Sequence, residues 1–271
     1  MMNPCENLEC ARTPVEIAGT FLETWLSLLL ILASVVCGET EEIVFAVRQP
    51  RGDHWYENFG HAISDEKKAA YGAGGHLCKL DLVSGRVTVL LAASQGSVRD
   101  PQVHYEGNKI LFSYRKGGTP YYHLFEINQD GTGLKQLTDG PFDDIEPSYL
   151  PDGGIVFCSS RCNRFVPCWY VQVATLHRCD GDGQNIRPLS SNIEQDNTPW
   201  VLSDGRILYT RWEYVDRSRE HFHHLWVMNP DGSGQMVYYG NSTPGDVYLD
   251  AKPIPGTSRI VMVNSPNHGR K

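Results

Sequence analysis

An internal repeat of about 50 residues is the feature of this sequence that most constrains its fold. Prolines recur at spacings of 46, 52 and 54 residues, and glycines in turn-like segments recur at spacings of 46, 52 and 49 residues. The two series are Pro101, Pro147, Pro199 and Pro253, and Gly85, Gly131, Gly183 and Gly232. Because periods of about 20 to 50 residues are typical of solenoids and propellers, we expect stacked copies of one structural unit.

Each copy of the repeat divides into short strands separated by turns. Apolar and β-branched runs such as Ile110–Phe112, Ile155–Phe157 and Ile207–Tyr209 are bounded by Gly, Pro, Asp or Asn. Asp-Gly pairs at 130/131, 152/153, 182/183, 204/205 and 231/232 predict two-residue hairpin turns, since glycine accepts a positive φ. Almost no segment after residue 40 has a helical apolar period.

The sequence therefore predicts an all-β fold, a β-propeller of four-stranded antiparallel blades. The repeat units are 39–95, 96–142, 143–193 and 194–243, followed by a partial unit, 244–271. About four and a half blades are present, and a propeller removes its sheet edges by closing into a ring. We therefore expect the chain to be a fragment of a six-bladed or larger ring.

The first 38 residues have the character of a targeting segment. Trp25–Cys37 is a 13-residue run without a charge, which is short for a membrane span and suits the apolar region of a signal peptide. The preceding segment carries four glutamates and one arginine, whereas signal peptides normally begin with positive charge. A cleaved signal peptide and an N-terminal anchor both remain open, and either predicts a periplasmic or secreted protein that contacts membrane only through this segment.

Composition excludes several classes of protein. The chain is 41% hydrophobic and 21% charged, which argues against disorder and against a polytopic membrane protein. Its formal net charge is −8, which argues against a surface that neutralises phosphates, so we expect no nucleic-acid partner.

The amino-acid sequence of the repeats also resembles that of a known family. The short motifs LPDG at 150–153, ILY at 207–209 and MNPDGSG at 228–234 resemble TolB-like propeller repeats of exported bacterial proteins. Segments 115–164, 196–217 and 250–261 are similar to a propeller family that includes the middle domain of the hydrazine synthase alpha subunit. The resemblance implies a periplasmic, six-bladed propeller beside c-type haem domains. No C-x-x-C-H motif occurs in this sequence, so no cofactor is evident and haem is expected only from regions outside the chain.

Four cysteines fall within the third unit, at Cys158, Cys162, Cys168 and Cys179. In an exported chain they are candidates for a structural disulfide, and buried thiols or a zinc site are the alternatives. Cys78 is expected to be a small buried residue in a strand.

Three histidines precede the third strand of the fourth unit. On an extended strand His221 and His223 point to one side and His224 to the other, so His221 and His223 are candidate metal ligands. The alternative is a polar insertion between strands, and our expectation is that the chain holds no metal.

Arginines follow the second strand in three successive units, at Arg115, Arg161 and Arg211. With Tyr114, Trp212 and Glu213 they form a candidate binding face, because arginine and aromatic residues dominate interfaces. The alternative, which we favour, is structural pairing of these arginines with carboxylates between blades, with Asp100, Glu146 and Asp196 available.

No nucleophile elbow, phosphate loop, dinucleotide fingerprint or zinc-protease helix occurs, so catalytic residues are unknown. We expect an exported propeller that serves as a binding or assembly platform for a protein partner or for further domains of a longer chain. One alternative is the propeller portion of a multi-haem redox enzyme of hydrazine-synthase type. Another is a propeller that gates a separate hydrolase domain.

Overall fold

The computed structural model describes residues 41–50, 71–167, 171–216, 222–241 and 246–266, which form an almost entirely β structure. Residues 1–38, with the predicted targeting segment, lie outside the described residues. Within the described ranges the helical structure is a single 3₁₀ turn, η2 (Ser160–Cys162), and no helix there has the length and apolar character needed to cross a bilayer.

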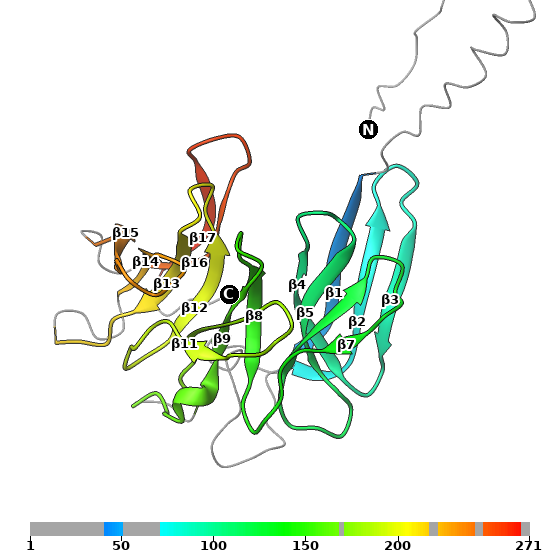
Figure 1. Cartoon of the computed structure of the whole chain (residues 1–271), viewed down its shortest axis with the longest axis horizontal. Helices are drawn as coiled ribbons and strands as arrows, with labels where there is room; N and C mark the ends of the chain where they lie inside the picture. Colours follow the sequence, from blue (N-terminus) through cyan, green and yellow to red (C-terminus); the bar gives the residue numbers. More distant parts are fainter. Residues whose placement is uncertain (1–40, 51–70, 168–170, 217–221, 242–245, 267–271) are drawn as a thin grey trace, which may run out of the picture. The chain divides into compact units, whose positions relative to one another are not determined.

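Antiparallel sheets follow one another along the chain (Figure 1). The first contains β1 (Glu42–Pro50), β2 (Tyr71–Asp81) and β3 (Val87–Ala93). The second contains β4 (Ser97–Val103), β5 (Lys109–Arg115), β6 (His123–Asn128) and β7 (Lys135–Gln136). The third contains β8 (Asp144–Tyr149), β9 (Ile155–Ser159), β10 (Thr175–Cys179) and β11 (Arg187–Pro188).

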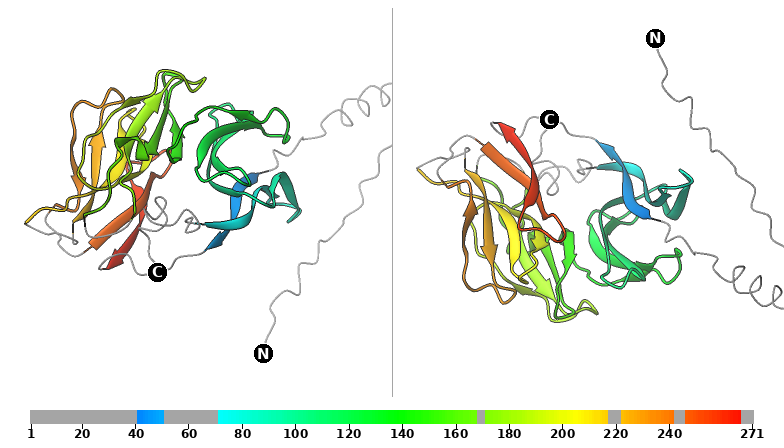
Figure 2. Two further views of the ribbon diagram at one scale, coloured as in Figure 1. Left: turned by 90° about the horizontal axis from the view of Figure 1, so that it is seen from below. Right: turned by 90° about the horizontal axis from the view of Figure 1, so that it is seen from above.

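The fourth sheet contains β12 (Asp196–Val201), β13 (Ile207–Trp212), β14 (His223–Met228) and β15 (Met236–Tyr239). A hairpin of β16 (Asp246–Pro253) and β17 (Ile260–Pro266) follows, and it joins β14 through one parallel pair, His223 with Val247. The second and third sheets each contain four strands, with neighbouring strands antiparallel and adjacent in sequence, whereas the fourth sheet together with the β16–β17 hairpin contains six. Figure 2 shows the sheets from two further directions. The predicted all-β propeller is confirmed.

The Asp-Gly pairs form hairpin turns, but the loops have three residues rather than the two predicted. Leu150 accepts a hydrogen bond from the N–H of Gly153 at 3.0 Å, and its own N–H donates to Gly154 O at 2.8 Å. Gly153 has a φ of 85°, which places it in the left-handed region that ends such a loop. The same two bonds recur at 128–132, 180–184, 202–206 and 229–233.

The repeated prolines mark an irregularity in the first strand of each sheet. The pairing shifts between Arg99 and Gln102 in β4, and the equivalent shifts occur in β8, β12 and β16. The shift in β16 lies between Leu249 and Lys252, so Ala251 occupies the position of the earlier prolines. The alignment of Pro253 with them was therefore wrong by two residues.

Apolar cores lie between neighbouring sheets. Ile110, Phe112 and Phe125 of the second sheet pack with Leu77 of the first. Val156 and Leu176 of the third sheet pack with residues of the fourth, including Ile207, Tyr209 and Trp212. The second and third sheets thus bury both faces, which fits the strongly apolar central strands of the repeat.

The repeated glycines lie where one sheet meets the backbone of the sheet before it. At Gly183, a Cβ atom would lie 2.1 Å from the carbonyl oxygen of Leu137 in the preceding unit. At Gly232, it would lie 2.7 Å from the carbonyl oxygen of Leu189. Gly183 and Gly232 therefore each form a close backbone contact with the preceding unit, at Leu137 and Leu189.

Candidate functional site

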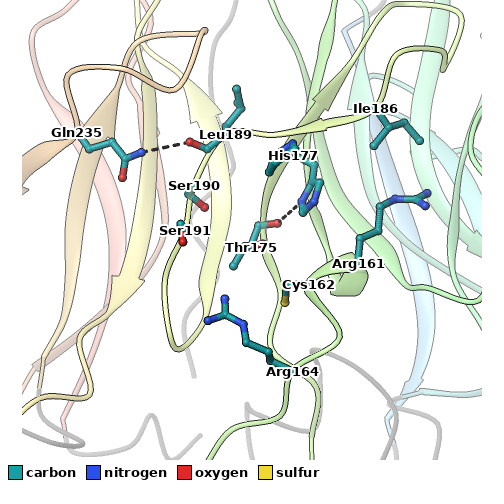
Figure 3. Close-up of a pocket in the computed structure, with 11 residues that line it drawn as sticks. Arg161, Cys162, Arg164, Thr175, His177, Ile186, Leu189, Ser190, Ser191 and Gln235 are labelled. Carbon is teal, nitrogen blue, oxygen red and sulfur yellow. Dashed lines mark hydrogen bonds between the residues drawn. The ribbon is translucent and has the colours of Figure 1, made fainter.

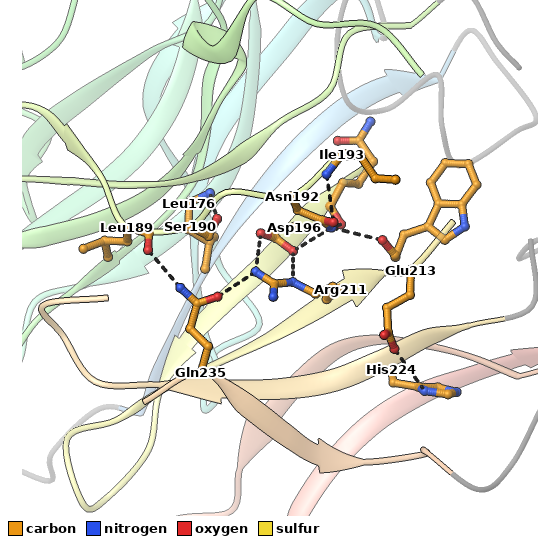
Figure 4. A network of polar contacts seen from close by, with 12 residues as sticks. Leu176, Leu189, Ser190, Asn192, Ile193, Asp196, Arg211, Glu213, His224 and Gln235 are labelled. Carbon is orange, nitrogen blue, oxygen red and sulfur yellow. Dashed lines mark hydrogen bonds and ion pairs between the residues drawn. The ribbon is translucent and has the colours of Figure 1, made fainter. Parts of the chain in front are cut away.

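Two of the three predicted arginines are held by carboxylates of their own sheet. Arg211 on β13 donates to Asp196 on β12 from Nε at 2.8 Å and from Nη2 at 3.1 Å (Figure 4). Nη2 also donates to Gln235 Oε1 at 3.0 Å, and Asp196 is fully buried. A bidentate, buried guanidinium–carboxylate pair of this kind fixes the geometry of the sheet.

Arg161 is tied in a similar way. Its Nη2 donates to Asp144 Oδ2 at 2.8 Å and to the carbonyl oxygen of Asp139 at 3.0 Å, and its guanidinium lies 4.9 Å from the centre of the Phe142 ring. Asp144 is fully buried and also accepts a 2.7 Å hydrogen bond from Ser159. The predicted partner Glu146 is therefore replaced by Asp144, and the pairs lie within sheets rather than between them.

Arg115 and Tyr114 lie in the packing of the second sheet. The guanidinium of Arg115 is 5.2 Å from the centre of the Tyr122 ring, and Arg115 is buried. Tyr114 packs edge to face against Phe125 with ring centres 5.1 Å apart.

Trp212 and Glu213 each contact one of the histidines of β14. Trp212 stacks on His223 with ring centres 4.9 Å apart, and both are buried. His224 Nδ1 lies 3.9 Å from Glu213 Oε2 (Figure 4). The His224 ring also packs against Phe222, with ring centres 4.6 Å apart. His221 lies outside the described residues, and the part of the chain that is described contains no group of three His, Cys, Asp or Glu placed to hold a metal ion.

The described cysteines show no disulfide bond, so the predicted disulfide is not confirmed. Cys158, Cys162 and Cys179 are free, and Cys168 lies outside the described residues. Cys158 packs in the core shared with the fourth sheet, whereas Cys179, on the adjacent strand, packs in the core shared with the second. Their thiols lie on opposite faces of the third sheet, so they cannot meet. Cys78 is a buried free thiol, as predicted.

A polar network that the sequence did not predict links the first strands of three sheets. Arg99 donates to Asp100 at 2.6 Å and to Glu146 at 3.1 Å. The backbone N–H of Glu146 donates to Asp100 Oδ2 at 3.1 Å, and the N–H of Thr198 donates to Glu146 Oε2 at 2.6 Å. Apart from the bond between Arg99 and Asp100, which lies within β4, each bond crosses from one sheet to the next. Burial raises the pKa of Glu146 to about 7; Arg99 opposes this rise, and the charges of Asp100 and Asp250 add to it.

A pocket of about 680 Å³ lies between the third sheet and the Gln235 turn of the fourth (Figure 3). Its polar lining includes Arg161, Arg164, His177 and Ser191, and Ile186, Pro188 and Leu189 form its apolar part. Its volume is within the range of small-molecule sites, about 300 to 1,000 Å³. Among the predicted site residues, Arg161 and Cys162 line this pocket.

Arg164 and His177 line the pocket but were not predicted from the sequence as site residues. A signal for them was available, because the third unit is longer than the second: its turn glycine follows the previous one after 52 residues rather than 46. The extra residues lie between β9 and β10, where Arg161, Cys162 and Arg164 are found.

Comparison with known proteins gives one curated relative. No family model matches the chain. Hydrazine synthase subunit alpha of Kuenenia stuttgartiensis is 24% identical over 298 residues, which cover 87% of this chain and 35% of that protein. The chain thus spans about a third of the length of the relative it matches.

Solved structures give a consistent result for the fold. The structure of Kuenenia stuttgartiensis hydrazine synthase matches with a TM-score of 0.70 and 20% identity, over 86% of this chain and 36% of that one. A puromycin hydrolase S511A mutant matches with a TM-score of 0.54 and 14% identity, over 86% of this chain and 33% of that one. At these identities the structures share a fold with this chain, and the chain is similar to hydrazine synthase subunit alpha in both sequence and fold.

Proposed function

We propose that this protein is an exported β-propeller that serves as a binding platform within a larger assembly. The observation that carries the proposal is the use of its charged residues: Arg211 and Arg161 are held by Asp196 and Asp144, inside the sheets. Such pairs stabilise a rigid scaffold and supply no free acid, base or nucleophile. The match to about a third of a larger relative supports a role as one module among several.

Export is tested with the N-terminal segment alone. We expect residues 1–45, fused to an alkaline phosphatase that folds only outside the cytoplasm, to give active enzyme. The variant Leu29→Arg places a charge in the apolar run Trp25–Cys37 and should abolish activity. Equal activity of the two fusions, or none from either, would refute export by this segment.

The platform role is tested on the full-length protein in the host that makes it. A tagged protein, cross-linked in cells and purified from the exported fraction, should recover one defined partner in a fixed ratio. The unlinked complex should run at the summed mass in size-exclusion chromatography. A protein that remains a monomer at micromolar concentration beside that purified partner would contradict the proposal.

The similarity to hydrazine synthase subunit alpha favours a second candidate, the propeller portion of a haem-containing redox enzyme. This chain has no C-x-x-C-H motif, so its residues do not fit covalent c-type haem attachment, and haem would belong to another domain or subunit. A haem absorption band in the purified complex, but not in this chain alone, would favour this candidate. A haem-free complex would rule it out.

A further inference from the structure

The pocket between the third and fourth sheets contains an arginine whose charge is not balanced by an ion pair. Arg164 is partly exposed and donates a hydrogen bond to the carbonyl oxygen of Asn192. Among the described residues no carboxylate lies within ion-pairing distance of it. A guanidinium with one neutral partner retains the donors that bind a carboxylate through two parallel hydrogen bonds.

Glu194 is the carboxyl group that interacts electrostatically with Arg164. At neutral pH, Glu194 does not neutralise the charge of Arg164. Glu194 is fully buried, and neither of its oxygens has a hydrogen-bond partner among the described residues. Burial raises its pKa to about 8, and Arg164 opposes that rise. The carboxyl group is therefore mostly protonated at pH 7, which leaves the positive charge of Arg164 for a ligand.

His177 supplies a second, different group. Its Nδ1 lies 3.0 Å from the carbonyl oxygen of Thr175, and since a carbonyl oxygen only accepts, Nδ1 carries the proton (Figure 3). Burial lowers the pKa of His177, so the ring is neutral and Nε2 is a hydrogen-bond acceptor. A ligand in this pocket can therefore donate a hydrogen bond to His177, most simply from a hydroxyl group.

The other walls limit the size and character of the ligand. Ile186, Pro188 and Leu189 give the pocket an apolar side. Gln235 is already engaged, since its amide nitrogen donates to Leu189 O at 3.2 Å and its oxygen accepts from Arg211. The ligand must therefore bring an apolar body, and Ser191, which is exposed and lines the pocket, is a further polar group that it can contact.

We propose that this pocket binds a small organic carboxylate that carries a hydroxyl group and an aliphatic body, with Arg164 on the carboxylate and His177 Nε2 accepting from the hydroxyl. A phosphate ester fits less well, because the second arginine, Arg161, is already paired with Asp144 and leaves one guanidinium for a dianion. This small-molecule site is independent of the platform role, so either proposal can fail without the other.

The test is calorimetric titration of the full-length protein with 2-hydroxy-4-methylpentanoate. Three comparison compounds each remove one feature: 4-methylpentanoate lacks the hydroxyl, 2-hydroxy-4-methylpentanamide lacks the charge, and inorganic phosphate lacks the aliphatic body. We expect binding of the hydroxy acid, at least fivefold weaker binding of 4-methylpentanoate, and no detectable binding of the amide. Tighter binding of phosphate, or equal binding of acid and amide, would overturn the proposal. Equal binding of the two acids would overturn the role of His177.

The matched variants are Arg164→Ala and Arg187→Ala. Arg187 lies on β11, between two residues of the pocket wall, but it is exposed and does not line the pocket. Arg164→Ala should raise the Kd of the hydroxy acid at least tenfold, whereas Arg187→Ala should change that Kd less than twofold. Arg164→Lys, which keeps the charge and loses the planar fork, is used if the alanine variant does not fold, and it should also weaken binding. Equal affinity of the Arg164 and Arg187 variants would refute the site.

Discussion

The contact between Gly183 and Leu137 predicts a large effect from one methyl group. Gly183 has a φ of 91°, and a Cβ atom there would lie 2.1 Å from the carbonyl oxygen of Leu137 and 2.7 Å from its carbonyl carbon. A left-handed conformation costs an alanine about 1 to 2 kcal/mol. Both close atoms belong to the backbone and cannot rotate away, so the overpacking adds about 1 to 3 kcal/mol. Gly183→Ala should therefore destabilise the protein by about 2 to 5 kcal/mol.

Gly205→Ala is the matched control for this prediction. Gly205 occupies another Asp-Gly turn with a φ of 85°, but no atom lies within 4 Å of its hypothetical Cβ. It should show only the conformational cost, about 1 to 2 kcal/mol. Gly232→Ala, at 2.7 Å from Leu189 O, should fall between the two. Urea unfolding of the full-length variants measures the differences, and equal losses for Gly183→Ala and Gly205→Ala would refute the proposed contact between units.

Three further predictions concern charge and thiols. Arg211→Ala leaves a buried carboxylate unpaired and should cost about 3 to 5 kcal/mol in urea unfolding, whereas Arg206→Ala, in an exposed pair, should cost less than about 1 kcal/mol. In the folded protein Glu194 keeps its proton up to about pH 8, whereas in the unfolded chain Glu194 loses it near the ordinary pKa of a glutamate. The free energy of unfolding should therefore fall by up to about 1.4 kcal/mol per pH unit between about pH 5 and 8. In the Glu194→Gln variant, the free energy of unfolding should fall less steeply with pH above pH 7 than in the original protein. The same slope in both proteins would contradict the raised pKa of Glu194. Cys162 should react with a thiol reagent in the folded protein, whereas Cys158, which is fully buried, should react only after unfolding. If neither cysteine reacts in denaturant, both are oxidised and the prediction is wrong.

The sequence was sufficient to predict the sheets because apolar runs and turn residues recur at fixed spacings. Strand existence depends on this local pattern, and the Asp-Gly turns fall where it places them. The three-residue loops could not be distinguished from two-residue loops, since both use glycine in the left-handed region.

Ion-pair partners were harder to predict because they depend on the face to which each side chain points. Asp144 and Glu146 are two residues apart, which in a regular strand places them on one face. Glu146 instead has a φ of 53°, and the strand pairing shifts between Ile145 and Ser148. The irregularity turns Glu146 toward Arg99, and Asp144 alone reaches Arg161. No spacing in the sequence reveals this change of face.

The same irregularity explains why strained residues recur at one position of the repeat. Asp100, Glu146, Thr198 and Asp250 all have φ between 50° and 55°, a conformation that costs a residue other than glycine about 1 to 3 kcal/mol. At Asp100 and Glu146 the side chain accepts a hydrogen bond from the backbone N–H of the left-handed residue in the next sheet. Such a hydrogen bond contributes about 0.5 to 1.5 kcal/mol, and about 1.5 to 3 kcal/mol when the carboxyl group is charged, which offsets the strain. At Asp100 and Glu146, glycine would remove the strain and would also remove the acceptor that links one sheet to the next.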